Sequence, residues 1–254
     1  MRPNRLKATL REGRRAVGVL LTLQSAELVE LFGHLGYDFV FLDAQHGGLT
    51  VETARDLIRA AELTGMTPLV RVPRNDPSVI LEYLDVGAAG IIVPNIATRA
   101  AAAAAVQAIK YPPRGTRGAS TLSRAAFYGV TQSAADYLRR ANEETLFVPL
   151  LEDREVLDVL PDVVGVDGVD VVLIGPADLA LSMGIPGGWS DPRVQAEVDR
   201  IARAARAAGR PAMIVALDPE DGRRLIDRGF QALLVPSGPV IAQAARSFLD
   251  ALRA

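Results

Sequence analysis

The chain has 254 residues, of which 49% are hydrophobic and 5% aromatic, and its formal net charge is −2 at pH 7. This length suits one α/β barrel or two small domains, while the charge and the scattered arginines argue against nucleic acid as a partner. The sequence has no cysteine, which excludes disulfides and thiolate zinc sites. The basic start lacks the apolar core of a signal peptide and no apolar run reaches membrane-spanning length, so we expect a cytoplasmic protein without a membrane partner.

The chain reads as strand and helix segments in regular alternation. Apolar runs typical of buried parallel strands are each followed by a stretch with helix-start signals or helical periodicity. The expected strands are 16–23, 39–42, 68–72, 90–93, 146–151, 169–174, 211–215 and 232–235, and the expected helices are 25–35, 51–64, 77–86, 97–109, 153–160, 192–208, 219–227 and 239–253.

The alternation is interrupted once, at residues 110–129. This segment is long and glycine-rich, and loops of that kind are usually functional. Eight strand–helix units favour a (β/α)8 TIM barrel over an open doubly wound sheet. Because no linker or low-complexity segment divides the chain, we expect residues 1–254 to form a single barrel domain.

The segment 170–184, DVVLIGPADLALSMG, indicates where the chemistry lies. Its apolar strand is stopped by Gly175 and Pro176 just before a lone acid, Asp178. In α/β barrels, polar residues past the carboxyl ends of the strands form the active site. The alternative is that Asp178 only caps the next helix.

Three other polar residues end or follow apolar strands in the same way. His46 follows the second strand, Arg71 ends the third and Glu152 ends the fifth. Each has a structural alternative: a surface histidine, an arginine whose stem covers apolar surface, and a glutamate at a helix start. Together with Asp178 they converge on one face of a barrel, which favours an active site.

The residue types suggest enolate chemistry. Glu152 and Asp178 come from neighbouring strands and can share a hard divalent cation such as Mg²⁺ or Mn²⁺. Such a cation can chelate a 2-oxo acid and polarise its carbonyl. Arg71 is suited to hold the resulting enolate oxygen, and His46 is the natural proton acceptor.

Other charged residues have structural interpretations. His34, near the end of the first helix, is expected to be a helix C-terminal cation or a packed surface residue. Asp85, on the helix after the third strand, would by itself be expected in a salt bridge, although a carboxylate beside a histidine favours the protonated ring. The only lysines, Lys7 and Lys110, do not fall at strand ends, which disfavours a Schiff-base aldolase.

Six segments carry a resemblance that covers nearly the whole chain. The chain resembles the metal-dependent class II pyruvate aldolases, the family of 4-hydroxy-2-oxoheptanedioate aldolase and 2-keto-3-deoxy-sugar-acid aldolases. The segments are GYDFVFLDAQHG at 36–47, LVRVP at 69–73, LDVGAAGIIVP at 84–94, YPPRGTRG at 111–118, SRAAFYG at 123–129 and LIGPADLALSMG at 173–184.

The resemblance implies roles for three catalytic residues. His46 would be the catalytic base, Asp85 would raise its basicity, and Arg71 would stabilise the transition state. It also implies a barrel of the phosphoenolpyruvate/pyruvate type, whose last helix, here 239–253, is swapped between subunits of a homohexamer.

The same resemblance implies a metal and substrate site. Glu152 and Asp178 would hold the divalent metal, which would be Mg²⁺, Mn²⁺ or Co²⁺, and the backbone at Ala177 would contact the substrate carboxylate. Asp43 and Leu150 belong to the expected substrate-binding set.

Two positions depart from the family pattern. The family commonly has Glu before its histidine, where this chain has Gln45, so a charge beside the base is missing. It commonly has Gln two residues before the metal-binding Glu, where this chain has Leu150, so one hydrogen bond to the oxo acid is missing. The enolisation residues are retained.

The leading hypothesis is a carbon–carbon lyase that reversibly cleaves a 4-hydroxy-2-oxo acid into pyruvate, or a close analogue, and an aldehyde. Arg114 and Arg117 are candidates to meet the aldehyde. One alternative is a barrel enzyme for a phosphorylated substrate, because 236–238 follows the eighth strand, where barrels often bind phosphate. Another is a catalytically silent 2-oxo-acid-binding protein, which the departures at Gln45 and Leu150 motivate.

Overall fold

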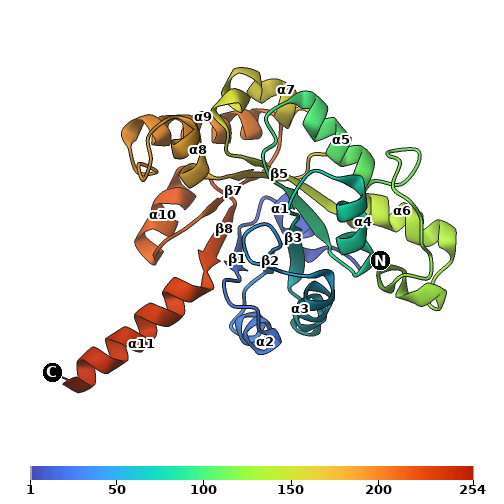
Figure 1. Ribbon diagram of the computed structural model, residues 1–254, viewed down its shortest axis with the longest axis horizontal. Helices are drawn as coiled ribbons and strands as arrows, with labels where there is room; N and C mark the ends of the chain where they lie inside the picture. Colours follow the sequence, from blue (N-terminus) through green and yellow to red (C-terminus); the bar gives the residue numbers. More distant parts are fainter. Residues whose placement is uncertain (1, 254) are drawn as a thin grey trace.

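The computed structural model describes residues 2–253 and confirms the predicted barrel. Eight parallel strands pair in chain order, and β8 pairs with β1 to close the ring (Figure 1). The strands are β1 (Ala16–Leu20), β2 (Phe39–Asp43), β3 (Thr67–Arg71), β4 (Gly90–Val93), β5 (Leu146–Leu151), β6 (Val172–Ile174), β7 (Ala212–Val215) and β8 (Ala232–Pro236).

Helices follow the strands and cover the outside of the barrel (Figure 1). All eight predicted helical regions are present, and α1, α6 and α8 are additional. The α-helices are α1 (Arg5–Arg11), α2 (Ala26–His34), α3 (Val51–Thr64), α4 (Pro77–Asp85), α5 (Arg99–Ile109), α6 (Ala134–Glu144), α7 (Leu160–Val164), α8 (Pro176–Ser182), α9 (Pro192–Ala207), α10 (Pro219–Asp227) and α11 (Ser237–Arg253), and the 3-10 helices are η1 (Arg124–Gly129) and η2 (Arg154–Val159).

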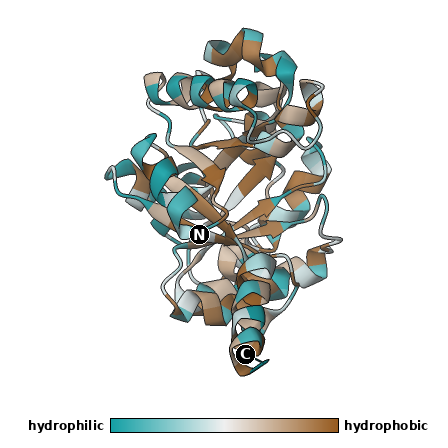
Figure 2. Ribbon diagram, turned by 90° about the vertical axis from the view of Figure 1, so that its left-hand side faces the viewer, coloured by the Kyte–Doolittle hydropathy of each residue, from teal (hydrophilic) through white to brown (hydrophobic). Residues whose placement is uncertain are grey.

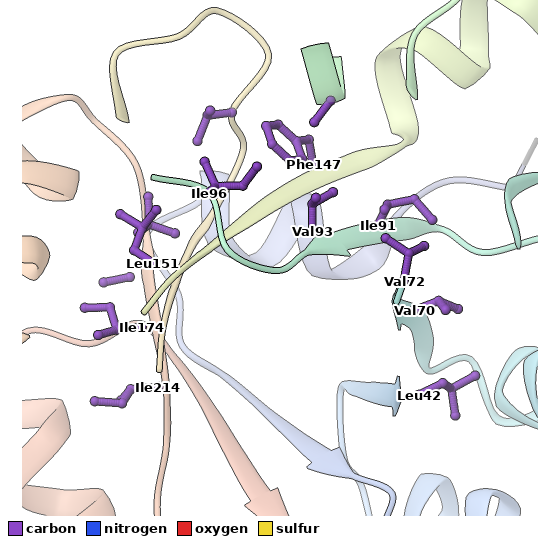
Figure 3. Close-up of a cluster of buried hydrophobic side chains, with 14 of the residues drawn as sticks. Leu42, Val70, Val72, Ile91, Val93, Ile96, Phe147, Leu151, Ile174 and Ile214 are labelled. Atoms are coloured by element: carbon purple, nitrogen blue, oxygen red, sulfur yellow. The ribbon is translucent and has the colours of Figure 1, made fainter. Parts of the chain in front are cut away.

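Two apolar layers hold the fold together. Side chains alternate along each strand, so one set fills the barrel interior and the other packs between strands and helices. The interior layer includes Phe39, Phe41 and Leu173. The outer layer is the larger one and includes the outward-facing residues Leu42, Val70, Val72, Ile91, Val93, Phe147, Leu151, Ile174 and Ile214 (Figure 3). Colouring by hydropathy shows the same arrangement, with hydrophobic strands inside and mostly hydrophilic outer helix faces (Figure 2).

Helix α1 closes the end of the barrel where the strands begin, called the amino end below. Its Leu6 and Leu10 belong to the interior apolar cluster and are 1% and 4% exposed. Asn4 caps the helix by accepting a hydrogen bond from the backbone N–H of Lys7 at 3.0 Å. The polar site residues predicted at strand ends lie at the opposite end, where the strands finish, called the carboxyl end below.

The segment after α5 lies at the amino end, because it connects the end of a helix to the start of β5. It contains η1 and α6 rather than a simple loop. Arg124 of η1 donates to the carbonyl of Val86 at 3.0 Å, beside the end of α4. The functional loop predicted at 110–129 is therefore at the opposite end of the barrel from the carboxyl ends of the strands.

The last helix, α11, extends away from the barrel (Figure 1). Its apolar side chains Phe248 and Leu252 are 68% and 72% exposed. Only its first residue, Ser237, is fully buried, and the Ser237 hydroxyl lies 3.0 Å from that of Thr22 and accepts a hydrogen bond from the Thr22 backbone N–H. In residues 2–253, no helix is long and apolar enough to cross a membrane.

Candidate active site

An ion pair between two neighbouring strands lies at the carboxyl end of the barrel. Arg71, the last residue of β3, donates from Nε to Asp43 Oδ1 at 2.9 Å and from Nη2 to Oδ2 at 2.5 Å. Each side chain is 12% exposed. Burial by itself would raise the pKa of Asp43, but the hydrogen bonds and charge of Arg71 and the backbone amides of His46 and Gln45 lower it overall. Asp43 is therefore held as a carboxylate.

Asp43 also shapes the turn that carries the histidine. Its Oδ1 accepts the backbone N–H groups of Gln45 and His46 at 3.0 and 3.2 Å. The His46 side chain is exposed and borders a cavity of about 180 Å³ that Asp43 and Gln24 also line. The side-chain oxygen of Gln45 is buried without a hydrogen-bond partner among the described residues. Because Asp43 contacts both segments, it brings His46 and Arg71 to one place.

Glu152 follows β5 and is almost completely buried, at 3% exposed. Its Oε1 accepts the backbone N–H of Asn95 at 3.0 Å. Burial raises the pKa of Glu152 to about 7, and the negative charge of Asp178 adds to this, while the Asn95 hydrogen bond and the charge of Arg71 act in the opposite direction. Arg71 ends β3, Glu152 follows β5 and Asp178 follows β6, so all three lie at the carboxyl end of the closed parallel barrel.

Asp178 and Ala177 lie in the first turn of α8, directly after β6. Both are exposed. Gly175 occupies the N-cap position and no side chain caps this helix, so the interpretation of Asp178 as a helix cap is wrong. Amide groups in a first helical turn have no partner within the helix. Among residues 2–253, the backbone N–H of Ala177 has no hydrogen-bond acceptor, and it directly precedes Asp178 in the chain.

The two acids have the chemistry of a hard-metal site. Glu152 carries a buried carboxylate whose charge is opposed by burial and by a second acid, and a divalent cation would relieve both effects. One Glu152 oxygen is engaged by Asn95 and the other accepts no hydrogen bond within residues 2–253. No group of three or more His, Asp or Glu residues in the described chain could hold a metal. Mg²⁺ and Mn²⁺ bind through one or two carboxylates with water or substrate oxygens in the other positions, so the residue types of Glu152 and Asp178 suit such an ion.

Leu150 faces the barrel interior beneath Glu152. It is 3% exposed and belongs to the interior apolar cluster. A methyl group built on Gly175 would lie 3.2 Å from its Cδ1 and 3.0 Å from Glu152 Oε2, so these three residues pack closely. Leu150 borders the metal-binding candidate but offers only apolar contact.

Asp85 is not brought to His46 within the chain. It is the last residue of α4 and accepts a hydrogen bond from Arg117 Nη2 at 2.8 Å, at the amino end. The Arg117 side chain is 2% exposed and its guanidinium lies 4.5 Å from the Tyr111 ring centroid. The predicted contact of Arg117 with an aldehyde at the carboxyl end is therefore not formed within one chain. Arg114 is exposed at the same amino end, where its Nη1 lies 3.4 Å from the carbonyl oxygen of Asn142.

The remaining predicted residues lie away from the site or support it. His34 is exposed in the last turn of α2, as expected. Lys7 and Lys110 are both buried and belong to α1 and to the segment after α5. Asn95 was missed by sequence reasoning, although a polar residue just past β4 was an available signal. Its left-handed backbone, with φ of 53°, directs its N–H to Glu152.

Comparisons with known proteins show the family of the chain. The family described as HpcH/HpaI aldolase/citrate lyase matches residues 16–237. The chain is 38% identical to a hydroxypyruvate/pyruvate aldolase from Sagittula stellata, over 91% of this chain and 90% of that protein. It is 35% identical to a 4-hydroxy-2-oxo-heptane-1,7-dioate aldolase from Escherichia coli, over 96% of this chain and 93% of that protein.

Solved structures show the same relationship. A family protein from Burkholderia cenocepacia J2315 has a TM-score of 0.94 and 30% sequence identity, over 99% of this chain and 100% of that one. The citrate synthase SbnG has a TM-score of 0.87 at 29% identity, over 98% and 97% of the two chains. The resemblance found in the sequence is confirmed, and the protein is a member of the HpcH/HpaI aldolase/citrate lyase family.

Proposed function

We propose that the protein is a metal-dependent aldolase that reversibly cleaves a 4-hydroxy-2-oxo acid into pyruvate, or a close analogue, and an aldehyde. The observation that carries this proposal is the convergence of Arg71, His46, Glu152 and Asp178 at the carboxyl end of the barrel. Aldolases named for pyruvate and for 4-hydroxy-2-oxo-heptane-1,7-dioate at 35–38% identity support the same reaction.

The substrate-binding roles follow from the side-chain chemistry. Glu152 and Asp178 would hold the cation, Mg²⁺ or Mn²⁺ and also Co²⁺, which when bound supplies a Lewis acid for the carbonyl of the oxo acid. The free N–H of Ala177 would hold the substrate carboxylate. Leu150 would touch the substrate through apolar atoms only.

In the bond-breaking step, His46 would act as the general base. Its imidazole would take the proton of the C4 hydroxyl as the C3–C4 bond breaks, which releases the aldehyde and leaves the electron pair in the enolate of pyruvate. The guanidinium of Arg71, aligned by Asp43, would stabilise the negative oxygen of that enolate. The protonated imidazole of His46 would then return this proton to C3 of the enolate, which gives pyruvate and frees His46; the reverse of this step exchanges the methyl protons of pyruvate with solvent.

The function can be tested without knowledge of the aldehyde. The enzyme is incubated with pyruvate in heavy water, with and without Mn²⁺ or Mg²⁺, and loss of the methyl proton signal is followed by NMR. We expect metal-dependent exchange that disappears in His46→Ala. Absence of exchange with pyruvate, hydroxypyruvate and 2-oxobutyrate, while metal-dependent ligand binding persists, would instead identify a silent oxo-acid-binding protein.

We further propose that the protein assembles as a homohexamer in which α11 is swapped between subunits. The exposed apolar residues Phe248 and Leu252 support this, since an amphipathic helix gains stability by burying such a face. Sedimentation of the wild type, of Phe248→Asp/Leu252→Asp and of the control Asp250→Asn tests it. Hexamers that dissociate only in the double variant are expected, whereas a monomeric wild type would refute the proposal.

The role of Asp85 toward His46 requires this assembly. Within one chain the two residues lie at opposite ends of the barrel, so a neighbouring subunit would have to supply the carboxylate. Co-expressed His46→Ala and Asp85→Ala chains test this directly. Activity that returns in mixed oligomers is expected, and inactive mixed oligomers would remove Asp85 from the site.

A further inference from the structure

A basic cavity lies at the amino end of the barrel, away from the candidate active site. It has a volume of about 570 Å³ and is bounded by α1, by the starts of β5 and β6 and by the segment between α9 and β7. Its charged lining residues are four cations and one acid: Lys7, Arg11, Arg206, Arg210 and Asp170. The whole chain has a net charge of −2, so this concentration of positive charge is a local feature.

Both oxygens of the single acid, Asp170, already have partners. Asp170 Oδ1 lies 2.7 Å from the Lys7 ammonium, and Oδ2 accepts the backbone N–H of Phe147 at 3.0 Å. Asp170 therefore compensates Lys7 and leaves three arginine charges without a counter-charge in the cavity.

The three arginines have hydrogen-bond donors without partners among residues 2–253. None of Arg11, Arg206 and Arg210 forms an ion pair with another residue between positions 2 and 253. Arg206 uses Nη1 to donate to the carbonyl of Arg228 at 2.7 Å, which holds its stem in place. The Nε of Arg210 is buried and has no acceptor among the described residues. A buried donor without an acceptor is costly, and a bound anion would satisfy it.

The neighbourhood carries still more positive charge. Lys110 lies 2.6 and 3.0 Å from the carbonyl oxygens of Thr145 and Asn142, and neither partner is charged. Burial lowers its pKa to about 8, and the charges of Lys7, Arg114 and Arg11 lower it further, while Asp170 opposes them. Lys110 therefore adds a further cation near the basic cavity, and Asp170 is the acid that acts on both lysines.

We propose that this cavity binds a small polyanion, recognised through its phosphate or multiple carboxylate groups by Arg11, Arg206 and Arg210. Guanidinium groups match the planar, two-point geometry of carboxylate and phosphate oxygens. The volume is within the range of small-molecule sites and exceeds what one inorganic ion fills.

Calorimetric titration of the metal-loaded enzyme tests the site. Inorganic phosphate, adenosine 5′-monophosphate and tricarballylate serve as probes at a fixed free Mn²⁺ concentration, which separates phosphate from carboxylate recognition. The test variant is Arg11→Gln/Arg210→Gln, which keeps much of each stem, and the control is Arg203→Gln, an exposed arginine of α9 outside the cavity. Proton exchange of pyruvate and circular dichroism report whether each variant remains folded and active.

We expect at least one probe to bind the wild type, and its affinity should fall as salt is added. Removal of each arginine should raise the Kd of the probe by about tenfold or more, so the double variant should bind about a hundredfold more weakly. The rate of pyruvate proton exchange should not change. The Arg203→Gln control should bind like the wild type. Equal binding by the double variant, or no binding of any of the three probes, would overturn the proposal.

Discussion

Arg71 and Asp43 are register partners on β3 and β2 as well as partners in a two-point ion pair, with 2.9 Å between Nε and Oδ1 and 2.5 Å between Nη2 and Oδ2. The parallel pairing of two strands therefore sets the orientation of the guanidinium plane. A cation that is already aligned needs little reorganisation when negative charge develops on a substrate oxygen.

Replacing Arg71 by Lys should expose the importance of this alignment. An ammonium group cannot make both bonds to Asp43, so we expect kcat/KM for aldol cleavage to fall by about 10²–10³, with Arg71→Ala at least as low. Metal affinity, measured by calorimetry, should stay within a few-fold of the wild type because Arg71 is not a ligand. Full turnover by either variant would remove Arg71 from the reaction.

Glu152→Gln should weaken metal binding without destabilising the fold. The amide oxygen of Gln can still accept the Asn95 N–H, but the charged ligand is lost. Metal affinity should fall by at least about tenfold, because hard cations depend on carboxylate charge, while the melting temperature without metal stays the same or rises. Glu155→Gln, at an exposed position of η2, is the matched control. Unchanged metal affinity of the Glu152 variant would contradict the assignment.

Gly175→Ala should disturb the same site sterically. The added Cβ would lie 3.0 Å from both Cβ and Oε2 of Glu152 and 3.2 Å from Leu150 Cδ1, so the glutamate must shift. We expect metal affinity to weaken several-fold, with a loss of about 1 kcal/mol of stability. In Gly222→Ala, the control, the nearest contact is an ordinary 3.6 Å from Leu233 Cδ1, and alanine in a helix interior should stabilise by about 0.5–1 kcal/mol. Equal metal affinity in both variants would show that Gly175 is not required.

Lys110 should give the protein a characteristic stability profile at alkaline pH. Its side chain is buried at 1% exposed, and burial lowers its pKa from 10.5 to about 8. Between these two values the unfolded chain binds more protons than the folded one, so the contribution of Lys110 to the free energy of unfolding increases as pH rises. Below about pH 8 the penalty for burying the charged form is fully present.

The comparison with Lys110→Met isolates this effect. The stability of the wild type relative to the variant should improve by up to about 3 kcal/mol between pH 8 and pH 10.5, measured by urea denaturation at each pH. A difference that does not change with pH would show that Lys110 has its ordinary pKa in the folded protein.

The barrel and the positions of its strands could be predicted from local patterns. Apolar runs interrupted by glycine, proline and polar residues located all eight strands, and the helices Val51–Thr64 and Pro219–Asp227 were predicted to the residue. Helix α1 was missed because it has few apolar residues, yet two of them close the barrel.

Closure of the barrel decided how the predicted site residues relate to one another. Strand ends alone predicted that His46, Arg71, Glu152 and Asp178 share a face, because all parallel strands finish on the same side. The sequence did not show that Asp43 connects Arg71 to His46, since that contact depends on the register of β2 and β3. It also did not show that Asn95 supports Glu152.

The sequence by itself determined the fold class, the family and the residue types of the candidate active site, because hydrophobic periodicity and strand-end polarity are local properties. Only the tertiary structure decided that Asp85 and Arg117 pair at the amino end of the barrel, and that Lys7 and Arg210 meet in a basic cavity there. The reason is physical: such contacts join segments far apart in the chain, and their geometry exists only once the strands have closed into a ring.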